Sequence, residues 1–218
     1  MPTIQGALIL DHLTVGPFQT NVYVVGCSHT KEAAIIDGGG DAQGLLAIAE
    51  KHELNITQIL QTHAHVDHVA ALPELNKALP NAPISLHKAD KMLYDHAPEQ
   101  GAMFGYPVNP LPSVTTWIEE GDIIEIGDLR AQVLWMPGHS PGSVIFYFEE
   151  QDTMISGDVI FYGSMGRVDL PGSNPEDMRK SLKRLRDYPD ATRIYSGHGP
   201  DTSLGREKQG NPFLSQDW

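Results

Sequence analysis

Four side chains of the kinds that bind metal ions are crowded into the segment between Thr62 and His68. They are three imidazoles and one carboxylate: His63, His65, Asp67 and His68. Neutral imidazole and carboxylate oxygen are the ligands that zinc and other borderline divalent ions take in proteins. The apolar run at residues 56–60 predicts a buried strand just before them, so they should emerge at a strand end. This density of ligands favours a metal site over an ordinary polar turn.

Three further candidate ligands, His139, Asp158 and His198, each follow a predicted strand and lie beside a glycine. Glycine lets neighbouring backbone approach closely, which a compact site at a sheet edge requires. Together with the first cluster they make a set of seven ligands, which is enough for two metal sites. The sequence therefore predicts that several strand ends converge on one metal-binding edge.

The elements that must position these ligands are short apolar runs mixed with amphipathic segments. Apolar runs and alternation predict strands at residues 4–15, 20–25, 33–36, 56–60, 84–86, 123–126, 129–136, 143–148, 153–156 and 193–196. Helical periodicity and capping signals predict helices at residues 41–52, 69–79, 175–188 and about 204–208. Strands mixed with helices throughout predict an α/β layered fold with sheets at its centre.

Length and composition favour a single cytoplasmic domain spanning residues 1–218. The chain has 218 residues, 40% of them hydrophobic, which is ordinary for a globular protein with a sizeable core. No apolar stretch approaches the roughly 18 residues that span a bilayer, so we expect no membrane association. The N-terminal residues lack the pattern of a secretory signal. Cys27 is the single cysteine, which excludes an intrachain disulfide and suits a reducing compartment.

The net charge of −13 argues against nucleic acid as a partner, because binding to a polyanion depends on clustered positive charge. One basic cluster stands out from this background: Arg179, Lys180, Lys183, Arg184 and Arg186. Apolar residues interleave it at helical spacing, so it is predicted to be the solvated face of an amphipathic helix rather than an anion site.

The chain resembles the metallo-β-lactamase-fold hydrolases, and within them the glyoxalase II (hydroxyacylglutathione hydrolase) group. The matching motifs run in the same order over nearly the whole chain: His63-x-His65-x-Asp67-His68, Pro137-Gly138-His139-Ser140-Pro141-Gly142, Gly157-Asp158, Gly166-Arg167-Val168-Asp169 and Gly197-His198-Gly199. The resemblance implies an α/β fold of four layers, an αββα sandwich, with the metal ions at one edge of the paired sheets.

The resemblance also implies a role for each candidate ligand. One metal ion would be held by His63, His65 and His139. The other would be held by Asp67, His68 and His198, with Asp158 bridging both. Two divalent ions, zinc first and iron or manganese as alternatives, would share a water molecule and lower its pKa towards 7, giving a bridging hydroxide. Asp67 would also act in catalysis by orienting this nucleophile.

The leaving group helps to choose the substrate. A thiol with a pKa of about 8.5 departs readily as thiolate, whereas an amide nitrogen needs a proton donor. The motifs contain no separate acid, which favours a thioester such as S-lactoylglutathione over a lactam. Glyoxalase II enzymes typically carry a helical C-terminal domain that contacts glutathione, but only 20 residues follow His198 here. The chain therefore resembles the shorter bacterial-type members, and no glutathione-binding residue is assigned.

Three rival functions share these motifs. A persulfide dioxygenase would bind a single iron through two histidines and one carboxylate, plausibly His63, His139 and Asp158. An RNA-processing phosphodiesterase of the same superfamily would also use two metal ions, but it would need a basic track for the RNA backbone. A non-enzymatic scaffold with structural zinc would be expected to use thiolate ligands, which this set lacks.

Several other segments are expected to surround the site. The segment at residues 87–113 shows no clear strand or helix after Tyr94, and it is expected to be either a lid over the site or a cover for a sheet edge. Candidates for a pocket lip follow Asp158 in the sequence: Phe161, Tyr162 and Met165. Asp37 or Asp169 could orient a ligand imidazole, while Arg167 and Asp169 are expected to pair with each other.

Overall fold

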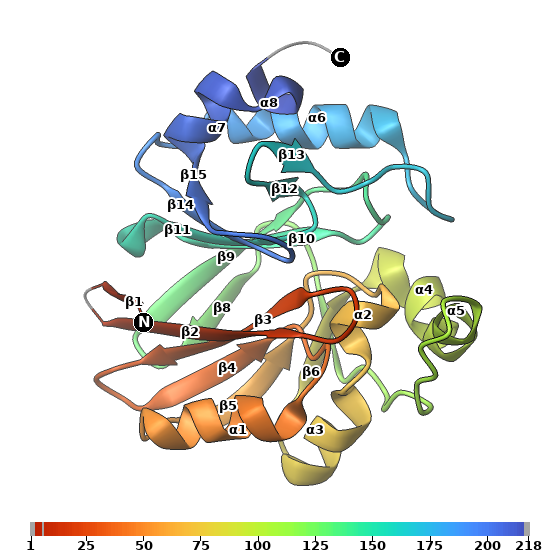
Figure 1. Cartoon of the computed structure of the whole chain (residues 1–218). Helices are drawn as coiled ribbons and strands as arrows, with labels where there is room; N and C mark the ends of the chain where they lie inside the picture. Colours follow the sequence, from red (N-terminus) through yellow and green to blue (C-terminus); the bar gives the residue numbers. More distant parts are fainter. Residues whose placement is uncertain (1–2, 6, 216–218) are drawn as a thin grey trace.

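The computed structural model describes residues 3–5 and 7–215 of the chain. Two β-sheets stack face to face, and helices cover the outer face of each sheet, so that four layers follow one another from bottom to top in Figure 1. The expected α/β sandwich of the αββα type is confirmed. Among the helices in these residues, none is long and apolar enough to cross a membrane.

The first sheet contains seven strands that lie in the order of the sequence. They are β1 (Thr3–Gln5), β2 (Leu8–Val15), β3 (Thr20–Cys27), β4 (Glu32–Ile36), β5 (Asn55–Leu60), β6 (Ile84–His87) and β7 (Thr116–Ile118). The strands from β1 to β4 pair antiparallel, and those from β4 to β7 pair parallel. Helices α1 (Ala42–Lys51) and α3 (Leu72–Ala78) cover its outer face. The carboxyl ends of β4 and β5 consequently meet at one edge.

The second sheet contains six strands. Their spatial order is β15 (Thr202–Ser203), β14 (Arg193–Ser196), β11 (Thr153–Gly157), β10 (Val144–Phe148), β9 (Leu129–Trp135) and β8 (Ile123–Ile126). Its outer helices are α6 (Pro175–Leu185), α7 (Leu204–Gly210) and α8 (Pro212–Ser215). A small hairpin of β12 (Ile160–Phe161) and β13 (Ser164–Met165) follows β11.

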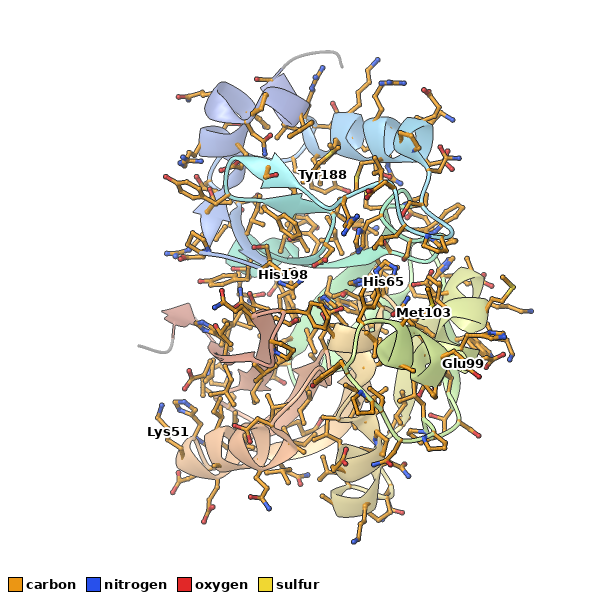
Figure 2. All side chains as sticks on the ribbon, turned by 45° about the vertical axis from the view of Figure 1, so that its right-hand side comes forward. Lys51, His65, Glu99, Met103, Tyr188 and His198 are labelled. Atoms are coloured by element: carbon orange, nitrogen blue, oxygen red, sulfur yellow. The ribbon has the colours of Figure 1, made fainter. Side chains whose placement is uncertain are left out.

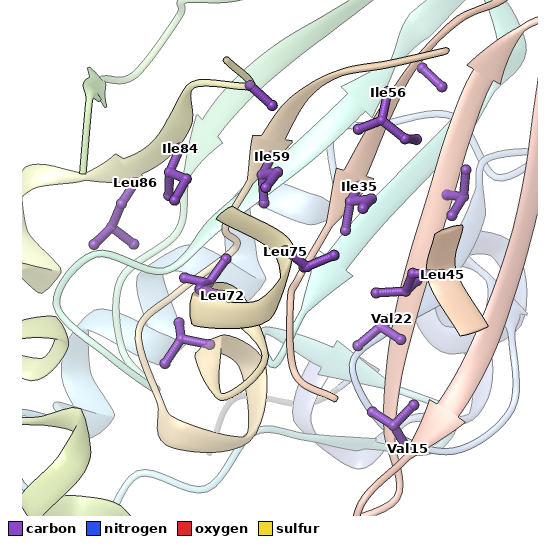
Figure 3. Packing of buried hydrophobic residues seen from close by; sticks show 14 of the residues in the cluster. Val15, Val22, Ile35, Leu45, Ile56, Ile59, Leu72, Leu75, Ile84 and Leu86 are labelled. Carbon is purple, nitrogen blue, oxygen red and sulfur yellow. The ribbon is translucent and has the colours of Figure 1, made fainter. Parts of the chain in front are cut away.

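Strand β4 shows how the sequence builds this sandwich, because both of its faces are buried. Ile35 packs with the helices on the outer side, whereas Ala34 and Ile36 pack between the two sheets. Successive side chains of a strand point to opposite faces, so an unbroken apolar run fills both layers. Figure 3 shows the outer layer, in which Leu72 and Leu75 of α3 lie over Ile35 and its neighbours. Full burial of such a side chain contributes about 1.5–3 kcal/mol.

The basic cluster lies on α6, as the sequence predicts. The helix buries Met178, Leu182 and Leu185 against the second sheet. Its charged side chains form surface ion pairs, for example between Lys180 and Asp177 at 3.4 Å. This helix face is therefore solvated and charge-compensated.

Three predictions of secondary structure are wrong in detail. The strand expected at residues 4–15 is two strands, β1 and β2, paired as a hairpin. The helix expected at residues 69–79 is divided into α2 (Val66–Val69) and α3. The segment after Tyr94 is not irregular throughout, because α4 (Lys91–Asp95) is followed by α5 (Ala97–Met103). Pro98 lies in the first turn of α5, where the missing N–H of proline costs nothing.

Candidate metal centre

All seven candidate ligands lie at the same edge of the sandwich, just beyond the ends of strands. The cluster from His63 to His68 follows β5 and includes the start of α2. From the second sheet, His139 follows β9, Asp158 follows β11 and His198 follows β14. Figure 2 shows His65 and His198 in the region between the two halves of the molecule. The structure thus brings the seven candidate ligands together.

The first group of possible ligands is made of three histidines. One ring nitrogen from each of His63, His65 and His139 lies within 4.8 Å of the others. His65 Nδ1 lies 2.8 Å from His139 Nε2. His63 Nε2 is buried and forms no hydrogen bond with any described residue. A buried nitrogen without a partner is costly, and a metal ion would satisfy it.

The second group contains Asp67, His68 and His198, whose ligand atoms also lie within 4.8 Å of one another. Asp67 Oδ2 is 3.3 Å from His198 Nε2 and 3.6 Å from His68 Nε2. Thr20 Oγ1 donates to the same oxygen at 2.8 Å, which orients the carboxylate.

Asp158 lies between the two groups. Its Oδ1 is 3.4 Å from His68 Nε2, and its Oδ2 is 3.4 Å from the Nε2 atoms of both His139 and His198. A single carboxylate therefore contacts histidines of each group, as a bridging ligand would. The assignment of all seven residues as metal ligands stays a prediction.

The electrostatics of the site suit a divalent cation. Burial lowers the pKa of His63 well below its usual value and lowers the pKa of His65 as well. Burial raises the pKa of Asp158, but the charge of His68 and the close contacts with His198 and His68 outweigh burial and hold this pKa well below its usual value. Neutral imidazoles beside ionised carboxylates are the donor set that zinc, iron or manganese requires.

Two other imidazoles respond to the carboxylates more than to burial. Burial lowers the pKa of His68, but Asp67, Asp158 and Asp37 raise it by more. Burial also lowers the pKa of His198, but its hydrogen bonds with Asp158 and Asp67 raise it to about 10. The carboxylates thus attract positive charge to this end of the cavity. A divalent cation would supply that charge in place of the two protons.

Asp37 orients His68. Its Oδ2 lies 2.9 Å from His68 Nδ1, which leaves Nε2 directed towards the centre. The same carboxylate accepts hydrogen bonds from the backbone N–H and the hydroxyl of Thr62, both at 2.8 Å. Asp169 does not have such a role, because it forms a bidentate pair with Arg167 at 2.6 and 2.8 Å. The expectation of a carboxylate behind a ligand histidine therefore holds for Asp37 alone of the two candidates.

Asp90 is a supporting residue that the sequence analysis missed. It is fully buried, and it accepts hydrogen bonds from Ala64 N and Ser140 Oγ at 2.9 and 2.8 Å and from Gly142 N. The carboxylate thus ties the backbone between His63 and His65 to the loop that follows His139. No local pattern marks Asp90, because its donors come from distant parts of the chain.

A cavity of about 350 Å³ lies over these groups. Of the seven candidates, five line it: His65, Asp67, His139, Asp158 and His198. Phe161 and Met165 also line it, as expected for a pocket lip, but Tyr162 does not and instead stacks under the Arg206 guanidinium at 3.4 Å. Gln100 and Phe104, at α5 and its end, show that the segment at residues 87–113 forms part of the cavity wall.

Gly197→Ala should weaken metal binding by roughly 10–100-fold, the range seen when the support of a ligand is lost. An added Cβ would lie 2.1 Å from Asp158 Oδ1 and 2.8 Å from His68 Cε1, so both side chains would have to shift. Metal affinity can be measured by competition with a chelator. Gly210→Ala is a matched control, because its Cβ would meet nothing within 4 Å. Equal affinities of the two variants would contradict this geometry.

Comparisons with known proteins agree with the fold. The family model described as the metallo-beta-lactamase superfamily matches residues 15–198. Hydroxyacylglutathione hydrolase GloC of Haemophilus influenzae is 35% identical over 94% of this chain and 98% of that protein. Probable metallo-hydrolase YqgX of Bacillus subtilis is 37% identical over 93% of this chain and 96% of that protein.

A solved structure is also similar to this chain over nearly the whole length of this chain. The crystal structure of TTHA1623 in a di-iron-bound form is 42% identical, with a TM-score of 0.86, and covers 94% of this chain and 100% of that chain. The resemblance stated from the motifs is confirmed by these matches. The chain belongs to the metallo-β-lactamase superfamily.

Proposed function

We propose that this chain is a binuclear metallohydrolase that cleaves thioesters, of the hydroxyacylglutathione hydrolase type. The observation that carries the proposal is the position of Asp158, whose carboxylate lies within 3.4 Å of histidines from both ligand groups. A site for a single metal ion would not need a carboxylate that contacts two separate groups of ligands. The similarity to GloC supports the choice of reaction.

The residues divide between two ions of zinc, with iron or manganese as alternatives for the same donors. One ion would be held by His63, His65 and His139, and the other by Asp67, His68 and His198, with Asp158 shared. Held by these residues, such ions would supply a nucleophile from water at neutral pH and Lewis-acid polarisation of a substrate carbonyl.

We assign to Asp67 the role of orienting the attacking water. It lines the cavity, and Thr20 fixes its Oδ2. No hydrogen bond from any residue in the described part of the chain reaches its other oxygen. Burial raises the pKa of Asp67, but His68 and His198 lower it to about 2, so the carboxylate is ionised at neutral pH. Oδ1 is then available to accept a proton of the attacking water and to hold it in line.

The polar groups of the cavity favour a thioester over an amide. The titratable residues among the described cavity lining are the five candidate ligands and Arg167, whose guanidinium stays protonated. None of them is a separate acid that could protonate an amine. A thiol with a pKa of about 8.5 leaves as thiolate without such help. A small-molecule thioester, with glutathione conjugates as the first to test, is therefore the substrate that we propose.

Metal content and thioester hydrolysis test the proposal together. Protein purified without chelators should contain about two metal ions per chain, and chelation should abolish hydrolysis until zinc, iron or manganese is restored. A metal-replete protein that leaves a panel of thioesters intact would refute the reaction. One iron per chain with oxygen consumption in the presence of a persulfide would favour the dioxygenase alternative.

Nucleic acid is not part of the proposal. An RNA backbone requires a track of cations, whereas the described cavity wall contains Arg167 as its one lysine or arginine. A salt-sensitive shift of RNA on a gel would reverse this choice.

A further inference from the structure

The cavity over the candidate metal centre has an apolar wall. This apolar wall consists of six side chains from five segments: Phe18, Val66, Phe104, Phe161, Met165 and Leu170. They come from the turn before β3, the start of α2, the end of α5, the β12–β13 hairpin and the segment before α6. Segments from both halves of the molecule therefore surround the candidate ligands with apolar side chains.

Two aromatic rings form the outer part of the apolar wall. Phe18 is 38% exposed and Phe104 is 51% exposed, and their rings meet edge to face at 6.0 Å. Phe18 also meets Tyr106 edge to face at 5.9 Å, so its ring is held from two sides. Deeper in the cavity, the ring of Phe161 lies 5.8 Å from that of His198. Exposed aromatic groups that gather beside a catalytic group are typical of a ligand-binding surface.

The charges of the cavity do not match those of glutathione. A glutathione conjugate carries two carboxylates and one ammonium group, and arginine or lysine is the usual side-chain partner of a carboxylate. Arg167 is the one such residue in the described lining, and Asp169 already compensates its charge through two hydrogen bonds at 2.6 and 2.8 Å. The remaining charges that face the cavity include the carboxylates of Asp67 and Asp158. Apart from the metal centre itself, the described lining thus offers a glutathione carboxylate no lysine or arginine whose charge is uncompensated.

We infer that the enzyme selects thioesters by an apolar group that packs against the apolar wall, and that the charges of glutathione contribute nothing to selection. The inference rests on the proposed thioester hydrolase function. The apolar group is carried by the acyl part or by the thiol part of the substrate. Its contact with Phe18 and Phe104 keeps the scissile carbonyl beside the candidate ligands.

A small panel of thioesters separates the possible outcomes. Lactoyl and hexanoyl groups are each joined to glutathione and to uncharged N-acetylcysteamine, and a lactoyl thioester of phenylmethanethiol is added. We expect the hexanoyl or the phenylmethyl compounds to exceed lactoyl-N-acetylcysteamine in kcat/KM by about tenfold or more, as apolar groups do in apolar pockets. A hexanoyl preference places the apolar group on the acyl side, and a phenylmethyl preference places it on the thiol side.

Two results would overturn the inference in different ways. If lactoylglutathione is the best substrate and loses about tenfold or more in kcat/KM when N-acetylcysteamine replaces glutathione, selection is by charge and only the inference fails. If the metal-replete protein hydrolyses none of the thioesters, the proposed function fails with it.

Phe104→Ala tests the apolar wall itself. The preference for the apolar substrate over lactoyl-N-acetylcysteamine should fall by about tenfold, mainly through KM. Met92→Ala is the matched control, because Met92 is a 74% exposed apolar residue of α4 that does not line the cavity. The melting temperature of both variants shows whether they fold. An unchanged preference in a folded Phe104→Ala protein would contradict the inference.

Discussion

Asp158→Asn should lower kcat/KM for thioester hydrolysis by about 1000-fold or more, since metal ions in such sites supply several kcal/mol of transition-state stabilisation. The substitution keeps the shape of the side chain but removes the charge that lies 3.4 Å from His68, His139 and His198. An amide is a poor ligand between two cations, so metal content should fall at the same time. Steady-state kinetics and elemental analysis of the same sample measure both effects.

Asp190→Asn is the control for this experiment. Asp190 is exposed, pairs with Lys208 at 2.6 Å and belongs to none of the groups of possible metal ligands among the described residues, so its amide should leave kinetics and metal content unchanged. A fully active Asp158→Asn protein with two metal ions would show that this carboxylate does not bridge them.

Asp37→Ala should destabilise the protein by about 3 kcal/mol, because breaking a buried charged network leaves its partners without compensation. The partners are the N–H and hydroxyl of Thr62 and the Nδ1 of His68, all within 2.9 Å of the carboxylate. Metal affinity should also fall by roughly 10–100-fold, because His68 loses the group that orients it. Urea unfolding measures the first effect, and titration with metal measures the second.

The two effects of Asp37→Ala can be told apart. Asp190→Ala should change the free energy of unfolding by no more than about 0.5 kcal/mol, as substitutions of exposed residues usually do. If Asp37→Ala lowers stability but binds metal as tightly as the unchanged protein, Asp37 stabilises the fold without positioning His68.

The sequence predicts the candidate site well because its signals are local. Each candidate ligand follows an apolar run that forms a strand, and such runs are recognisable without tertiary information. The family motifs then imply which ligands belong together. The structure brings the seven candidate ligands together, and it places Asp37 behind His68.

The parts that the sequence did not predict depend on contacts between distant segments. Helix α5 was missed because Pro98 and Gly101 are poor helix formers, yet an added Cβ at Gly101 would lie 2.3 Å from Tyr106 O. The glycine is there for close packing and does not break the helix. The helix expected at residues 69–79 is interrupted because Ala71 N donates to Gly38 O at 2.8 Å, a tertiary hydrogen bond that replaces one within the helix.

The unequal division of the ligands between the two halves affects how the protein folds. His63, His65, Asp67 and His68 are neighbours in the sequence, so the unfolded chain already holds a weak metal-binding segment. His139, Asp158 and His198 join them only when the two sheets dock, which is a step between distant parts of the chain. Because the unfolded chain competes for the ion, metal stabilises the fold by less than its full binding free energy. All seven candidate ligands can therefore bind metal together only after the two sheets have docked.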